Sequence, residues 1–257
     1  MLRQKLKVKF SKGEIKSLLV SVITIGFVFS FNDWGVEAFD AGVGLINLVR
    51  AIIISTIALV THIYIQKLVA KRYGQEIEYK IWSIQKLRTS FIYGGWGDIK
   101  KPIPLGVIIP LIVAFISNGE WLFLATAAFA FVGLKTRPGK RFPLITEYEE
   151  GKIAISGPLA NVGLAIILKL LSFSINFDPL VQMNLFIALF HLIPVQDLSG
   201  IKVWFGGRVL YIFNLTLIIF IALLLLVLTP ISAVIISLIC AIILSLVWFY
   251  HLELRTI

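Results

Sequence analysis

Residues 153–176 read IAISGPLANVGLAIILKLLSFSIN, and Lys169 is the one charged side chain among them. About 20 apolar helical residues are enough to cross the hydrocarbon core of a bilayer, which is about 30 Å thick. This stretch therefore predicts a transmembrane helix. Its first turns contain polar and helix-bending residues, Ser156 to Asn161, near one end of the span.

The rest of the chain has the same character. It has 257 residues, of which 58% are hydrophobic and 15% charged, and its mean hydropathy is +0.94. A typical soluble domain carries about 25% charged residues. The single Cys240 lies in an apolar run and can form no intramolecular disulfide. The apolar runs predict eight spans: residues 15–32, 43–66, 102–118, 121–134, 153–176, 179–196, 209–229 and 230–250.

Charge predicts the orientation of these spans. The tail before the first span is basic. All charged residues of the 33–42 loop are acidic, and the connection around 67–101 is basic again. Basic loops stay on the cytoplasmic side, so we expect both termini in the cytoplasm. The net charge of +10 then reflects topology. We expect no nucleic-acid binding, because the bases are spread over several loops and do not form one basic surface.

Several segments leave a choice of structure open. The first span resembles the apolar part of a signal peptide, but no A-x-A-like site follows it, so we expect it to be retained. The short third and fourth spans are joined by Asn118-Gly119-Glu120 and are either tilted or a re-entrant pair. Period-two alternation predicts strands at 5–10, 76–82 and 152–155, which form either a small cytoplasmic sheet or separate surface loops.

Three polar clusters interrupt the apolar spans. They are 61–67 (THIYIQK), 156–161 (SGPLAN) and 190–200 (FHLIPVQDLSG). The predicted topology puts all three at cytoplasmic helix ends, at similar depth. Polar residues within spans are costly and mark functional sites, so a shared polar pocket is expected.

These clusters resemble the motifs of site-two proteases, a family of intramembrane zinc metalloproteases. That family carries H-E-x-x-H followed by A-x-R/K-x-G, then G-P-L-A-N, then N-x-x-P-x-x-x-L-D-G. This chain has HIYIQ at 62–66 followed by Ala70, Arg72 and Gly74, then GPLAN at 157–161 and HLIPVQDLSG at 191–200. Order and spacing agree over residues 12–212, and the following Ile-Lys-Val resembles some archaeal members.

The resemblance also implies which catalytic positions have changed. His62 matches the first zinc ligand, but Ile63 replaces the glutamate base, Gln66 the second histidine, and Ser199 the aspartate. Two histidines one turn apart and a third ligand would hold the zinc, and the glutamate would activate its water. We therefore expect no ordinary catalysis and no resident cofactor.

A displaced zinc site is the alternative. His62, His191 and Asp197 have suitable chemistry for three ligands, although a base would still be missing. Otherwise we expect the two histidines to hydrogen-bond each other, Gln66 or Asn161. We expect Arg50, in the outer half of the second span, to snorkel or to pair with a loop acid.

The sequence thus predicts an all-α polytopic membrane bundle, about eight transmembrane helices on a six-helix core, with a small cytoplasmic-face β-sheet. It forms one domain over 1–257, with the protease-like core at about 43–212 and a helical hairpin at about 209–250. Its partners would be membrane lipid and transmembrane or membrane-proximal peptides. The predicted substrate groove contains Gly157, Pro158, Asn161, His191 and Pro194.

Three functions follow from this interpretation: a non-catalytic protease homologue that binds peptide segments, an active zinc protease with a displaced site, and a small permease. The permease lacks support, since no membrane-centre carboxylates and no paired broken helices are apparent. For packing, we expect another backbone to approach Gly157 closely and Gly106 to lie on a less crowded span.

Overall fold

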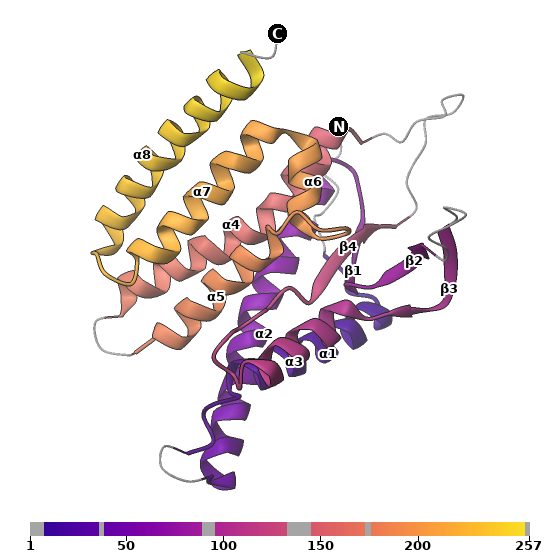
Figure 1. Ribbon diagram of the computed structural model, residues 1–257, viewed down its shortest axis with the longest axis vertical. Coiled ribbons are helices and arrows are strands. Elements are labelled where there is room, and N and C mark those ends of the chain that lie inside the picture. Colours follow the sequence, from indigo (N-terminus) through magenta and orange to yellow (C-terminus); the bar gives the residue numbers. More distant parts are fainter. Residues whose placement is uncertain (1–7, 36–38, 89–95, 133–144, 173–175, 255–257) are drawn as a thin grey trace.

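The computed structural model describes residues 8–35, 39–88, 96–132, 145–172 and 176–254 and is mostly helical (Figure 1). Its helices are α1 (Lys12–Phe29), α2 (Ala41–Arg72), α3 (Leu105–Ile116), α4 (Glu147–Leu171), α5 (Asp178–His191), α6 (Ser199–Gly206), α7 (Arg208–Leu224), α8 (Pro230–Trp248) and the π-helical turn η1 (Phe249–Leu254). Its strands are β1 (Ile77–Ile81), β2 (Ile84–Arg88), β3 (Trp96–Ile103) and β4 (Ala127–Phe131).

Helix α4 is the centre of the bundle. It packs against α2, α5, α6 and α7, while α8 packs on the outside of α7 and α1 lies against α2 and α3 (Figure 1). A capping box starts α4: Thr146 accepts a hydrogen bond from the Glu149 amide, and the Glu149 carboxylate accepts one from the Thr146 amide. Because this box satisfies the first amides, the helix already begins at Glu147. The predicted strand at 152–155 is therefore wrong.

Among the described residues, three helices are long and apolar enough to cross a membrane, namely Ala41–Arg72, Glu147–Leu171 and Pro230–His251. This is consistent with an integral membrane protein. Helices α3, α5 and α7 contain 12, 14 and 17 residues, and at 1.5 Å per residue they are shorter than the hydrocarbon core. The structure does not confirm a count of about eight spans, and the predicted orientation stays a prediction.

The predicted fourth span, 121–134, is wrong. Helix α3 ends in a turn where Asn118 and Gly119 both have positive φ, 50° and 77°. The chain then returns in extended form as β4 and pairs antiparallel with β1, Tyr79 facing Phe129. The alternation at 76–82 is confirmed as a strand. Of the predicted strand at 5–10, residues 5–7 lie outside the described residues and 8–10 form no strand.

The described part of the chain has two small sheets, each antiparallel and two-stranded, β1–β4 and β2–β3. The first lies beside the helix bundle (Figure 1). A buried ion pair joins Lys67 of α2 to Glu14 of α1, with 2.5 Å between the ammonium and the carboxylate oxygen. The same oxygen accepts a hydrogen bond from the Tyr79 amide at 2.9 Å, which fixes the position of the β1–β4 sheet. One side chain thus joins two helices and a strand.

Gly106, expected on an uncrowded span, is in fact tightly packed. A Cβ built on it would lie 2.1 Å from the carbonyl oxygen of Thr126. The reason is that the segment leading into β4 runs directly along α3, where the sequence predicted another helix. Gly163 of α4 is the uncrowded position, since a Cβ there would meet nothing within 4 Å.

Candidate functional site: a buried polar layer

The three polar clusters meet where α2, α4, α5 and the start of α6 pack together. His62, Gln66, Asn161, His191 and Ser199 are each at most 3% exposed. We call these five residues the buried polar layer. His62 and Gln66 lie one turn apart on one face of α2, and Gly157 of α4 lies against both of them. A Cβ on Gly157 would be 2.5 Å from Nε2 of His62, so only glycine allows this approach.

The two histidines of the layer lie side by side without a hydrogen bond between them. Their ring centroids are 4.7 Å apart and the planes are tilted by 47°. Nδ1 of His191 instead faces the Ile187 carbonyl at 2.8 Å. Because a carbonyl only accepts, this nitrogen must carry the proton, and Nε2 is left as an acceptor. The expected bond between the two rings is therefore wrong.

Gln66 completes a hydrogen bond that α4 cannot make for itself. Pro158 has no amide hydrogen, so the carbonyl of Ala154, four residues earlier, has no helical donor. Nε2 of Gln66 donates to this oxygen at 3.1 Å and to the hydroxyl of Ser199 at 3.4 Å. A side chain of α2 thus satisfies a carbonyl that would otherwise be unpaired in the interior.

Ile63 points away from the layer. It is buried with Tyr79 and Ala127, and Phe10 and Leu18 pack against the same cluster. The position of the expected catalytic base therefore belongs to the apolar core between α1, α2 and the β1–β4 sheet.

Some polar atoms of the layer have no hydrogen-bond partner among the described residues. They are Nδ1 of His62, Nε2 of His191, and both amide atoms of Asn161. Asn161 lies one turn after Gly157 on α4, and its side chain is fully buried. Unsatisfied groups cost roughly 1–3 kcal/mol each, which marks this layer as the place where function is to be sought.

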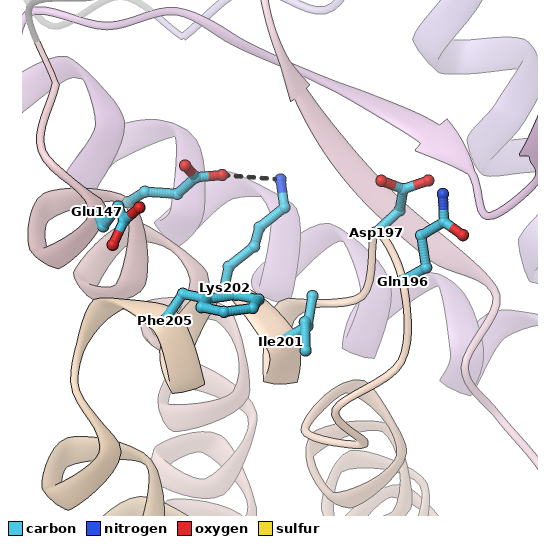
Figure 2. A pocket seen from close by; sticks show the side chains of 7 residues that line it. Glu147, Gln196, Asp197, Ile201, Lys202 and Phe205 are labelled. Carbon is cyan, nitrogen blue, oxygen red and sulfur yellow. Dashed lines mark ion pairs between the residues drawn. The ribbon is translucent and has the colours of Figure 1, made fainter.

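Pro194 and Asp197 are not part of the layer. Both are exposed on the α5–α6 turn, where Asp197 has a φ of 67°. Asp197 lines a surface hollow of about 480 Å³ with Glu147, Glu150 and Lys202 (Figure 2). In the described part of the chain, no three His, Cys, Asp or Glu side chains gather as a metal site. The set His62, His191 and Asp197 is therefore not brought together.

The sequence did not predict a role for Lys202 beyond its place in the Ile-Lys-Val that resembles some archaeal members. Its ammonium pairs with Glu150 at 3.2 Å, donates to the Phe129 carbonyl of β4 at 2.9 Å, and lies over the Phe129 ring. Burial lowers the pKa of Lys202, and the negative charges of Glu150 and Asp197 oppose that shift. Only the apposition of α6 and β4 reveals these contacts.

Comparison with known proteins gives one informative relative. The chain is 28% identical over 209 residues to a protein of Methanocaldococcus jannaschii named "Putative zinc metalloprotease MJ0611", and the match covers 76% of this chain and 85% of that protein. No family model matches the chain, and no solved structure matches it. The similarity supports a relationship to metalloprotease-like proteins.

The name of that relative implies a zinc ion. The residues of the buried polar layer do not form a set of zinc ligands. Catalytic zinc takes three protein ligands from His, Cys, Asp or Glu. Here Gln66 presents an amide that donates to Ala154 and Ser199, and Ser199 presents a neutral hydroxyl. Only His62 and His191 offer suitable nitrogens, and the nearest loop carboxylate, Asp197, lines the surface hollow.

Two glycines of α4 give a matched test of the close approach. Gly157→Ala should destabilise the protein by about 1–3 kcal/mol, because the new methyl group overpacks buried side chains. Gly163→Ala should be neutral or stabilising by up to about 1 kcal/mol, because alanine favours the helix. Unfolding in mixed micelles measures both. Equal effects would contradict the packing described for Gly157.

A double-mutant cycle tests the bond from Gln66. Gln66→Met should cost about 1–3 kcal/mol, because the Ala154 carbonyl loses its donor. In a Pro158→Ala background the helix supplies that donor, so the same substitution should cost measurably less. The coupling energy from the four unfolding free energies is the readout. Additive effects would show that the glutamine does not compensate for the proline.

Proposed function

We propose that the chain is a non-catalytic homologue of site-two-type intramembrane metalloproteases that binds transmembrane or membrane-proximal peptide segments. The observation that carries this proposal is the buried polar layer itself. Its three segments, which resemble the protease motifs, pack together, and in it Gln66 donates to Ser199 and to the backbone carbonyl of Ala154. The similarity to the archaeal protein supports the relationship.

The chemistry of the layer argues for loss of catalysis. A zincin needs a general base next to its first histidine ligand, and Ile63 offers none. That side chain is 2% exposed and packed in the core. General acid–base help alone contributes typically 10²–10⁴-fold to a rate. Binding without cleavage is the activity that remains compatible with these residues.

The outer edge of β4 is the proposed peptide site. Trp82 donates to the Thr126 carbonyl and Val132 to the Glu76 carbonyl, at 3.0 and 2.9 Å. Since bonded pairs alternate in an antiparallel ladder, the amide and carbonyl of Phe129 point away from β1. An extended segment adds to such an edge through its backbone. Lys202 caps the Phe129 carbonyl and must move aside when a peptide binds.

The outer edge of β1 is less suitable, because the chain covers it itself. The Tyr79 amide donates to Glu14, and the Lys67 ammonium donates to the Lys9 carbonyl at 3.0 Å. By contrast, the hollow of Figure 2 opens beside Lys202. Glu147, Glu150 and Asp197 give it three carboxylates against one ammonium, which favours the basic side chains common next to membrane spans.

Restoring the missing ligands tests the relationship to zinc proteases. The triple variant Ile63→Glu, Gln66→His and Ser199→Asp should bind about one Zn²⁺, since ligand type and i, i+4 spacing dominate affinity. The contact between Gln66 and Ser199 places two of these positions within reach of one ion. Metal analysis of the purified, folded variant is the measurement.

The control adds His62→Ala to the triple variant and should abolish the zinc uptake. Cleavage is not required, because groups that orient the ligands need not be present. A folded triple variant that takes up no zinc would show that these positions do not correspond to a zinc-protease face.

Peptide binding is tested separately in nanodiscs. The probe is a fluorescent apolar transmembrane peptide with a central Gly-Pro, which locally opens its helix. A copy with alternate backbone amides methylated should bind about tenfold more weakly or worse, because it loses strand hydrogen bonds worth about 1 kcal/mol each. Lys202→Met should tighten binding by uncapping Phe129. Equal binding of both peptides would exclude edge addition.

A further inference from the structure

A second hollow, of about 350 Å³, lies on the two helices that carry the histidines of the buried polar layer, but nearer the start of each helix. It is formed by the first half of α2 and the start of α5, and its apolar walls include Ile46, Ile53, Phe177 and Leu180. One cation, Arg50, lines it. In Figure 1 the first turns of α2 extend beyond the neighbouring helices.

Arg50 has no counter-ion within the described residues. The ion pairs there are Glu14 with Lys67, Asp178 with Lys169, and Glu150 with Lys202. Asp178, on the turn that borders the groove, is thus already paired. Asp40 uses its carboxylate to cap α2, accepting from the amides of Gly42 and Val43. Neither of these two acids pairs with Arg50, and the loop acid Glu37 lies outside the described residues.

The surface around Arg50 is apolar on both sides. Before it on α2, Val43 and Ile46 are 44% and 70% exposed; after it, Ile53 and Ile57 are 56% and 42% exposed. Arg50 lies roughly 14 Å from the start of α2, at 1.5 Å per residue. An exposed guanidinium inside such an apolar band is costly unless it snorkels to the membrane surface or an anion from the surrounding lipid neutralises it.

We propose that this groove binds one anionic phospholipid, with its phosphate on Arg50 and an acyl chain along Ile53, Phe177 and Leu180. A guanidinium binds a phosphate through two parallel hydrogen bonds. Asn176, which also lines the groove, accepts a bond from the Asp178 amide through its side-chain oxygen, and its side-chain NH2 group can donate to a headgroup. This proposal is independent of peptide binding.

Native mass spectrometry of the delipidated protein tests it, with phosphatidylglycerol and phosphatidylcholine offered in equal amounts. The wild type should retain one phosphatidylglycerol in preference to phosphatidylcholine. Arg50→Gln should lower that retention about tenfold, as expected for a charge-assisted pair, and Arg50→Lys should keep part of the preference. Leu180→Trp, which fills the groove but keeps the charge, should also lower it.

Arg72→Gln is the matched control, because Arg72 is an exposed arginine at the other end of the same helix. It should leave retention unchanged. Equal loss from Arg72→Gln, equal retention of both lipids, or full retention by Arg50→Gln would each overturn the proposal. Displacement of the lipid by inorganic phosphate would overturn the part assigned to the acyl chain. Monodisperse elution of each variant confirms that it is folded.

Discussion

The carbonyl of Ala154 is the constraint on which the arrangement of the bundle depends. Pro158 removes its helical donor, and in an apolar interior such a group must find another. The donor is Gln66, 3.1 Å away, which requires α2 and α4 to approach closely at this level. Gly157 permits that approach, since a side chain there would overlap His62. The close contact of α2 and α4 in turn sets the position of α5, which brings His191 against His62.

This constraint bears directly on chemistry. The residue that satisfies Ala154 is Gln66, which stands where the motif resemblance implies the second zinc-binding histidine. A side chain that donates to a carbonyl and a hydroxyl is not free to hold a metal. Tyr211 acts similarly on the α5–α6 turn, where its hydroxyl donates to the Leu192 carbonyl at 3.0 Å. At both places a side chain stabilises the bundle by donating to a backbone carbonyl.

The sequence predicted the features that depend on local pattern. Long apolar runs located α2, α4 and α8, and period-two alternation located β1.

Prediction from the sequence failed where tertiary contacts decide the local structure. The run predicted as a span at 121–134 is apolar enough for a helix, but after a turn of positive φ its residues Ala127–Phe131 pair with β1. Residues 152–155 alternate like a strand, but the capping box at Thr146 extends α4 over them. The positions of the span ends predicted that the three polar clusters converge. They did not predict where each side chain points, and Asp197 lines the surface hollow instead of the buried polar layer.

Ile63 stands where the motif resemblance implies a catalytic glutamate, and it has a packing role of its own. A glutamate at this position would have to remain solvated or beside a metal. Isoleucine instead packs with Tyr79 and Ala127, and Phe10 closes the same cluster. The N-terminal segment can then lie over the end of α2, where Lys67 bonds the Lys9 carbonyl and pairs with Glu14. The apolar side chain of Ile63 therefore helps to tie α1, α2 and β1 together at this level of the bundle.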